Sequence, residues 1–287
     1  MSVHADLAQS MLALCQQGAA ANRQTPARRG NVIVITPTDA DEVMITADLH
    51  GHRDNFRQLL DIADLDRHLR RHLILQEVCH GGPLYPHGGC QSHTLLEDVI
   101  RLKVRYPDRV HFLLSNHELA ELTDYPIVKG QRMLNLSFRC GMHEVYGPDA
   151  DDVREGYLEF LRTCPLAARL PGDVLVTHSL PERVDSRPFD VGVFDRPLAD
   201  EDFRQQGPIF QLVWGRDYRS ENAAAFAKLT DSKVLIHGHD PCPAGFKTPN
   251  DVQVILDCCS RPASYLILPT AMPLEHADIV RQIQLLS

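Results

Sequence analysis

Polar side chains follow at once after four short apolar runs of the chain, at residues 43–46, 111–114, 174–177 and 233–236. Runs of this length that are rich in β-branched residues are typical of buried strands. Similar runs predict further strands at residues 31–35, 73–75, 252–257 and 264–268. Apolar residues at helical spacing predict helices at residues 4–20, 54–63, 94–105, 152–162 and 223–229.

The order of these elements indicates a mixed α/β protein. Strands alternate with helices early in the chain and dominate late, which favours mixed sheets covered by helices. No break in composition and no long linker divides residues 31–287, and we expect a single domain there. Residues 1–30 are expected to form an N-terminal extension, in which a helix is followed by a mobile polar stretch at residues 22–30.

The balance of charges limits the partners of the protein. The chain of 287 residues has 29 lysines and arginines against 38 aspartates and glutamates, a net charge of -9. This acidic balance argues against a general nucleic-acid surface. No apolar stretch approaches the roughly 18 residues of a membrane helix, and the N-terminus lacks the pattern of a secretory signal. We expect a cytoplasmic protein without a membrane partner and leave its oligomeric state open.

Eight cysteines are scattered along the chain without a CxxC pair, and we expect reduced thiols. Residues 79–93 nevertheless hold five potential soft ligands: Cys79, His80, His87, Cys90 and His93. A structural zinc site is conceivable there, although the spacing fits no familiar zinc pattern. The glycines and prolines of the segment favour a flexible loop at the rim of a substrate site.

The polar clusters after the four apolar runs contain residues that bind metals, namely Asp48, His50, Asn116, His178 and His239. In open α/β sheets, ligands gather beyond the carboxyl ends of the strands. A single histidine after a strand would be an ordinary surface residue, but four clusters in the same structural position favour one shared metal centre. Carboxylate and imidazole ligands suit manganese, iron or zinc better than magnesium.

The order of these clusters resembles that of the calcineurin-like metallophosphoesterases, and most of all that of the serine/threonine phosphoprotein phosphatases among them. Residues 48–51 resemble the second half of the family's Gly-Asp-x-His-Gly motif, and residues 114–118 resemble its Gly-Asn-His-Glu motif. Residues 95–114 match the family's helix and strand closely. The later segments at residues 176–179, 213–216 and 238–240 extend the resemblance to about residue 268.

The second family motif, Gly-Asp-x-x-Asp-Arg-Gly, differs in this chain, where residues 76–82 read Gln-Glu-Val-Cys-His-Gly-Gly. Glu77 replaces the carboxylate that bridges two metals and keeps its charge. His80 replaces an aspartate that orients the histidine of the Asn-His-Glu motif, and a neutral imidazole supplies no negative charge. Gly81 replaces an arginine that binds phosphate in a bidentate manner. These changes indicate a different substrate or weakened catalysis.

The resemblance implies an α/β (α+β) fold, a four-layer α-β-β-α sandwich of two mixed sheets flanked by helices. It also implies two metal ions, manganese or otherwise iron or zinc, with a bridging hydroxide that attacks phosphorus. Asp48 and His50 would hold the first ion, and Glu77 would bridge the two. The second ion would be held by Asn116, His178 and His239.

Three further residues are catalytic candidates by the same resemblance. His117 would protonate the leaving alkoxide. Arg216 would bind phosphate oxygens, unless it only forms an ordinary salt bridge with a nearby carboxylate. His80 could contact His117 or the phosphate. His237 is expected to be a neighbour of the metal centre rather than a ligand, and Glu118 is expected to cap or orient its helix.

The chain is therefore interpreted as a metal-dependent phosphomonoesterase acting on phosphoprotein or on a small phosphate ester, nucleotides included. The alternative is a catalytically weak relative that keeps the fold as a binding module. A redox or zinc-structural protein built on the cysteines is a third, remote reading. All six ligand positions hold competent ligands, which favours the enzyme. The irregular stretches at residues 125–148 and 180–208 do not reveal the substrate.

Overall fold

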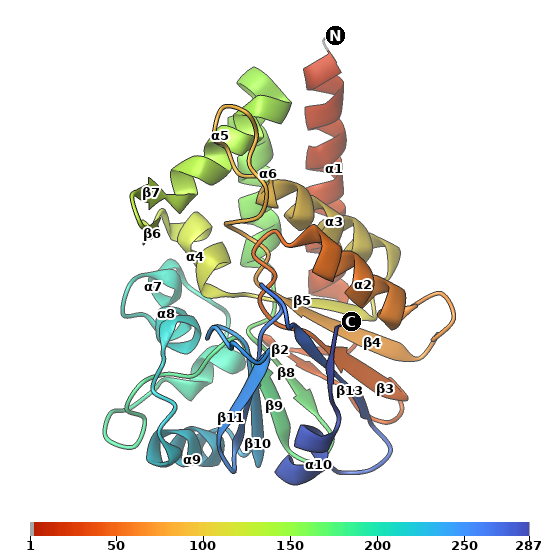
Figure 1. Ribbon diagram of the computed structural model, residues 1–287, viewed down its shortest axis with the longest axis vertical. Coiled ribbons are helices and arrows are strands. Elements are labelled where there is room, and N and C mark those ends of the chain that lie inside the picture. Colours follow the sequence, from red (N-terminus) through yellow and green to blue (C-terminus); the bar gives the residue numbers. More distant parts are fainter. Residues whose placement is uncertain (1–2, 287) are drawn as a thin grey trace.

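The computed structural model describes residues 3–286 and contains two large mixed sheets with helices packed around them (Figure 1). The larger sheet has seven strands. In spatial order they are β1 (Arg28–Arg29), β2 (Val32–Val34), β8 (Ala167–Leu170), β9 (Val174–Thr177), β10 (Val234–His237), β12 (Gln253–Leu256) and β11 (Phe246–Asn250). In this sheet β9, β10 and β12 run parallel to one another.

The second sheet has five strands, and a separate hairpin pairs β6 (Val128–Lys129) with β7 (Arg132–Met133). The spatial order of the five strands is β14 (Ile283–Leu285), β13 (Ser264–Pro269), β3 (Glu42–Ile45), β4 (Arg71–Gln76) and β5 (Val110–Leu113). Strands β3, β4 and β5 are parallel, so their carboxyl ends meet at one edge of the sheet.

Helices cover the sheets from both sides (Figure 1). The α-helices are α1 (Val3–Gln24), α2 (Arg53–Ala63), α3 (Ser92–Arg105), α4 (Asn116–Thr123), α5 (Leu134–Tyr146), α6 (Ala150–Arg162), α7 (Asp200–Phe203), α8 (Pro208–Trp214), α9 (Ser220–Leu229) and α10 (His276–Arg281). In Figure 1, α1, α5 and α6 stand above the strands, and α9 and α10 lie below them. The predicted four-layer α-β-β-α sandwich is confirmed.

The strands that carry the predicted metal ligands lie deep in the protein. Every residue of β4, β5, β9 and β10 is buried. Strands enclosed on both faces read as continuous apolar runs rather than alternating ones, which is why the sequence pattern located them. Their burial makes the carboxyl ends of the strands a rigid base for whatever side chains follow.

The N-terminal segment is packed more tightly than its polar sequence indicates. The expectation that residues 22–30 are mobile is wrong, because Asn22 and Thr25 are buried and β1 extends the larger sheet. The Asn22 amide donates to the Thr163 hydroxyl at 3.0 Å, and the buried Lys103 ammonium donates to the Thr25 hydroxyl at 2.7 Å. Polar residues of this segment therefore satisfy buried partners on α3 and α6. Whether residues 1–30 form a separable extension stays a prediction.

Two further sequence expectations need refinement. The strands β2 and β3, predicted at residues 31–35 and 43–46, follow one another in the sequence but belong to different sheets. The stretch at residues 125–148 contains the well-formed helix α5, which its mixed composition did not predict. All eight cysteines are free, and within residues 3–286 no helix is long and apolar enough to span a bilayer.

Candidate metal centre

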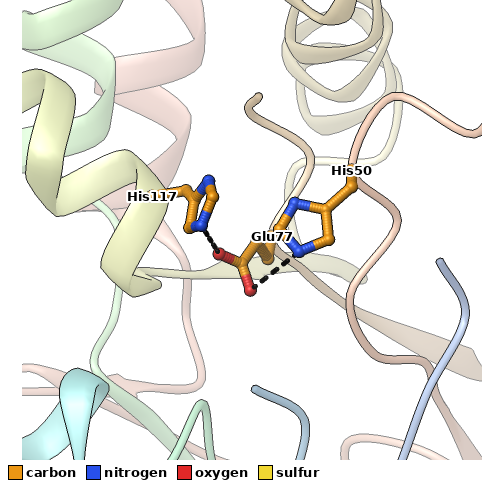
Figure 2. A group of neighbouring side chains, drawn as sticks. All are labelled: His50, Glu77 and His117. Carbon is orange, nitrogen blue, oxygen red and sulfur yellow. Dashed lines mark ion pairs between the residues drawn. The ribbon is translucent and has the colours of Figure 1, made fainter. Parts of the chain in front are cut away.

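Glu77 lies at the centre of the predicted site, directly after β4. Its carboxylate belongs to two groups of potential metal ligands, one with His50 and His117 and one with His178 and His239. In the first group, Glu77 Oε2 lies 3.9 Å from His50 Nε2, and Glu77 Oε1 lies 3.6 Å from His117 Nε2 (Figure 2). A carboxylate shared between two ligand groups has the position that a bridging ligand requires.

The second group is tighter and includes the predicted ligand Asn116. His178 Nε2 lies 2.7 Å from Asn116 Oδ1, 3.2 Å from His239 Nδ1 and 3.2 Å from Glu77 Oε2. His239 Nδ1 lies 2.9 Å from Asn116 Oδ1. Four potential ligand atoms thus converge, although the residues come from the ends of four different strands.

Two of the histidines, His50 and His178, have oxygen atoms next to Nδ1. These contacts orient each ring so that its other nitrogen, Nε2, points into the cluster. His50 Nδ1 lies 3.2 Å from the carbonyl oxygen of Cys79 and 3.1 Å from that of His80. His178 Nδ1 lies 3.3 Å from the side-chain oxygen of Gln76. Because each of these oxygens can only accept a hydrogen bond, Nδ1 carries the proton and Nε2 is left as the ligand atom.

Asp48 closes the cluster from the end of β3. Its carboxylate oxygen accepts a hydrogen bond from the backbone nitrogen of His239 at 2.9 Å and lies 3.8 Å from His178 Nδ1. A side chain at Gly238 would overlap this carboxylate, so the turn after β10 approaches Asp48 only because residue 238 is glycine. The structure thus brings all six predicted ligands together at the edges of the two sheets.

The electrostatics of the cluster favour a bound cation. Burial, followed by the charge of Glu77, raises the pKa of Asp48 to about 8, and burial raises the pKa of Glu77 to about 7. Burial lowers the pKa of His178 to about 4, which keeps that imidazole neutral. Glu77 Oε1 is buried and has no hydrogen-bond partner. Two buried carboxylates beside an imidazole that burial keeps neutral, that of His178, fit divalent metal ions, which would supply positive charge.

The raised pKa values of the two carboxylates predict that the metal-free protein becomes less stable as the pH rises from about 6.5 to 8. The folded protein keeps protons on Asp48 and Glu77 that the unfolded chain releases near its ordinary values of 3.8 and 4.5. Above about pH 6.5, the ordinary histidine pKa, stability therefore falls up to about pH 8, whereas at lower pH the lowered pKa values of buried histidines such as His178 act in the opposite direction. A loss of about 2 kcal/mol would lower the melting temperature by roughly 4–8 °C.

Thermal melts of chelator-treated protein across this pH range, with and without manganese, measure the effect. Saturating manganese should remove the decline, because the ions replace the protons on both carboxylates. A metal-free melting temperature that rises steadily from pH 6.5 to pH 8 would contradict these assignments.

The backbone at the cluster adopts conformations that non-glycine residues rarely take. The φ angles are 42° at His50, 34° at Glu77 and 68° at His239. Left-handed conformations of this kind cost about 1–3 kcal/mol each and are found mostly at functional sites. Three of the six predicted ligands carry such a conformation, which supports a functional reason for their placement.

His117, the predicted proton donor, lies in the first turn of helix α4 beside Glu77 and is largely buried. Its Nδ1 lies 3.0 Å from Nδ1 of His80. His80 was predicted to contact either His117 or the phosphate, and the structure shows the contact with His117. Burial, assisted by the imidazoles of His50 and His80, lowers the pKa of His117 well below its usual range. The ring nitrogen of His117 that faces Glu77 is Nε2.

Arg216, the predicted phosphate ligand, lies in an ion pair. Its guanidinium donates to Asp240 at 2.8 Å, and its side chain is half exposed. Asp240 follows His239 directly, so this pair sits at the edge of the metal centre. The salt bridge that was the alternative role of Arg216 is therefore present. Its contact with phosphate stays a prediction.

Gly81 occupies a position where an arginine cannot be accommodated. Its φ angle is 125°, and a Cβ atom there would lie 2.6 Å from the carbonyl oxygen of His50. We expect Gly81→Arg to destabilise the protein by about 1–3 kcal/mol or more and not to increase activity, although it restores the family's residue. Gly88→Arg is the control, because Gly88 has a φ of 94° but no atom within 4 Å of its Cβ position.

Melting temperatures of the two glycine variants measure this difference. Gly81→Arg should melt clearly below Gly88→Arg. A Gly81→Arg protein that is as stable as wild type and more active would show that the turn after β4 can adopt the family's conformation.

Other predicted residues take supporting positions. Glu118 accepts hydrogen bonds from the backbone nitrogens of Val78 and Cys79, at 3.0 and 2.8 Å, so it fastens the turn after β4 to α4. His237 is buried in β10, where its Nδ1 lies 3.0 Å from the Thr177 hydroxyl, and it belongs to neither ligand group. Within residues 3–286, neither ligand group includes a cysteine or histidine of the segment at residues 79–93.

Two open depressions lie beside the cluster. One, of about 690 Å³, is lined by Trp214 and Phe210 together with the polar residues Glu182, Arg187, Gln205, Gln206 and Gln211. The Trp214 ring lies 6.3 Å from the His239 ring, which connects this depression to the metal ligands. The other, of about 370 Å³, lies on the side of His50 and is lined by Arg53 and Arg57. Both volumes fall in the range of ligand sites.

Two mixed sheets whose strand ends bring carboxylates, imidazoles and an amide to one point form the scaffold of a metal-dependent phosphoesterase. Residues 42–245 match the family model of the calcineurin-like phosphoesterases. This match covers more than half of the chain, and the chain belongs to that family. No curated protein matches the sequence significantly.

Solved structures of phosphatases share the fold at low sequence identity. A protein serine/threonine phosphatase from Saccharomyces cerevisiae is 14% identical, with a TM-score of 0.66 over 97% of this chain and 89% of that one. A cold-active protein-tyrosine phosphatase from a psychrophilic Shewanella species is also 14% identical, with a TM-score of 0.59 over 91% and 83%. At this identity the likeness shows the fold and does not distinguish the two substrate classes.

Proposed function

We propose that the protein hydrolyses phosphate monoesters with the help of two metal ions, manganese first and iron or zinc otherwise. The substrate is a phosphorylated side chain or a small phosphate ester such as a nucleotide. Asp48 and His50 would hold the first ion, Glu77 would bridge the two, and Asn116, His178 and His239 would hold the second. Bound there, the ions would act as Lewis acids and lower the pKa of a water molecule that attacks phosphorus.

The position of Glu77 carries this proposal. Its carboxylate belongs to both ligand groups, and its Oε1 atom is buried without a hydrogen-bond partner. A structural carboxylate in this place would be expected to have a donor for each oxygen. The missing donor to Oε1 is explained if this oxygen binds a cation.

The surrounding residues have separate tasks in this scheme. His117 would donate a proton from Nε2 to the leaving oxygen as an imidazolium, since its Nδ1–H is hydrogen-bonded to His80, and it would return to the neutral form with Nδ1 still protonated. Arg216 can leave its half-exposed pair with Asp240 to bind phosphate oxygens. The depression beside Trp214 offers room for the organic part of the substrate.

Hydrolysis of 4-nitrophenyl phosphate by chelator-treated protein, with and without added manganese, tests the proposal. We expect turnover only with the metal, and faster turnover of this monoester than of the diester bis(4-nitrophenyl) phosphate. Phosphoserine peptides, phosphotyrosine peptides and nucleotides then compare the substrate classes.

The alternative, a binding module with little catalysis, is supported by one observation: Gly81 leaves no room for the family's phosphate-binding arginine. Manganese bound in equilibrium dialysis without turnover of any of these substrates would favour the binding module. The absence of both bound metal and turnover would exclude both functions.

A further inference from the structure

A buried carboxylate behind the metal centre has no role in the scheme above. Glu121 lies on α4, and only 2% of its side chain is exposed. Its Oε1 atom lies 2.8 Å from Nε2 of His80, whose side chain is fully buried. The other ring nitrogen of His80 lies 3.0 Å from Nδ1 of His117. Glu121, His80 and His117 therefore form a continuous chain of hydrogen-bonding groups that ends at the proposed proton donor.

The direction of the hydrogen bonds in this chain follows from the chemistry of its ends. An ionised carboxylate can only accept, so His80 donates from Nε2–H to Glu121. The Nδ1 atom of a neutral His80 is then an acceptor, and His117 must donate from its Nδ1–H. This arrangement fixes the rings of both histidines and leaves His117 Nε2 directed at Glu77, which lies 3.6 Å away.

Glu121 is surrounded by a hydrogen-bond donor and two positively charged groups. The Asn135 amide donates to Glu121 Oε1 at 3.0 Å. The guanidinium groups of Arg154 and Arg139 lie 3.5 and 3.9 Å from Glu121 Oε2. His117 and Glu121 are four residues apart on α4, so both side chains lie on one face of the helix and His80 fits between them.

We propose that Glu121, acting through His80, is a positioning residue for His117. The pair Glu121–His80 thereby does the work of the aspartate that the family has at position 80: the negative charge is retained, one imidazole further from His117. This inference rests on the proposed role of His117 as proton donor. Because Glu121 supplies the negative charge, catalysis does not require the aspartate that His80 replaces.

Glu121→Gln tests the proposal, because it keeps the size of the side chain and removes its charge. For phenyl phosphate, whose leaving group needs a proton, we expect kcat to fall roughly 10- to 100-fold. KM and bound manganese should stay within about twofold of wild type. For 2,4-dinitrophenyl phosphate, whose leaving group needs no proton, kcat should change by less than about threefold. An equal loss with both substrates, or no loss with either, would overturn the proposal.

Glu97→Gln is the matched control. Glu97 is also buried and lies 3.2 Å from a histidine, His93, but nothing connects this pair to His117 in the hydrogen bonds of residues 3–286. Its carboxylate instead accepts from the hydroxyls of Tyr146 and Tyr157. Glu97→Gln should lower the melting temperature without a loss of kcat that depends on the leaving group.

A rescue variant separates charge from structure. His80→Asp combined with Glu121→Gln places a carboxylate at position 80, as in the family, and should recover most of the kcat that Glu121→Gln alone loses. If the double variant is folded and no more active than Glu121→Gln, a negative charge behind His117 does not support proton donation.

The tautomers of the histidines provide a test that does not depend on hydrolysis. Long-range ¹H–¹⁵N spectra of the metal-free protein near pH 8, above the ordinary histidine pKa of about 6.5, report which ring nitrogen carries the proton. We expect Nε2–H at His80 and Nδ1–H at His117, with mixed tautomers in Glu121→Gln and no change in Glu97→Gln. The opposite tautomers in wild type would refute the positioning role. The expected tautomers in a protein without turnover would refute the proposed function instead.

Discussion

Asp48→Asn should abolish the metal-dependent hydrolysis of 4-nitrophenyl phosphate, with a loss of roughly 10³-fold or more. Loss of an outer partner of a ligand typically costs about 10- to 100-fold in metal affinity or activity, and loss of a charged ligand should exceed this. Asparagine keeps the shape of Asp48 and can still accept the hydrogen bond from the backbone of His239. The expected loss therefore reflects the missing charge and not a disrupted turn.

The same substitution should have the opposite effect on the metal-free protein. Burial and the charge of Glu77 raise the pKa of Asp48 to about 8, so its ionised form is destabilising in the absence of a cation. Asp48→Asn should raise the melting temperature of chelator-treated protein at pH 8 and reduce the gain that manganese gives to wild type. Asp54→Asn, at an exposed position of α2, is the control and should change neither property.

An Asp48→Asn protein with wild-type turnover would show that Asp48 is not a metal ligand. A protein that is both inactive and less stable without metal would indicate a structural role for the carboxylate. The two measurements together therefore distinguish a ligand from a structural residue.

His117→Ala should lower kcat by roughly 10²- to 10⁴-fold for substrates with poor leaving groups, the usual contribution of a general acid. The loss should shrink for 2,4-dinitrophenyl phosphate, because its leaving group departs without a proton. Steady-state kinetics with both substrates at saturating manganese measures this difference.

Metal content decides between two roles for His117. Its Nε2 atom lies within 3.6 Å of Glu77 Oε1, and the residue belongs to the ligand group of His50. As a proton donor, His117 can be removed without loss of manganese, and dialysis should find the same metal content in His117→Ala as in wild type. Loss of one metal ion and an equal loss of kcat for both substrates would make His117 a ligand instead.

The sequence predicted the buried strands and the convergence of the candidate ligands for a common physical reason. Strands β4, β5, β9 and β10 are enclosed on both faces, so they appear as uninterrupted apolar runs. The polar clusters that follow them meet because parallel strands end at the same edge of a sheet. The convergence of Asp48, Glu77 and His178 could thus be anticipated from the order of runs and clusters alone.

Other features could not be anticipated because they depend on contacts between distant segments. Helix α5 and the packing of residues 22–30 rely on tertiary partners and leave weak local patterns. Gln76, which holds the ring of His178, is the polar last residue of a buried strand. Glu121 looks like an ordinary helix residue in the sequence, and only the structure places its carboxylate against His80.

The structure explains the glycine at position 81 differently from the comparison with the family motif. The sequence indicates only that a phosphate-binding arginine has been lost. The structure shows that the turns after β3 and β4 are in backbone contact at Gly81, so that no side chain fits there. The loss of the arginine and the close approach of these turns are therefore one feature of the site.

Anomalous diffraction from crystals soaked in manganese tests the central claim, the binding of two cations by six side chains, most directly. We expect two peaks on opposite sides of the Glu77 carboxylate, roughly 3.5–4 Å apart. One should contact Asp48 and His50, and the other should contact Asn116, His178 and His239. A map without signal at Glu77, or with manganese only at other surface residues, would contradict the account.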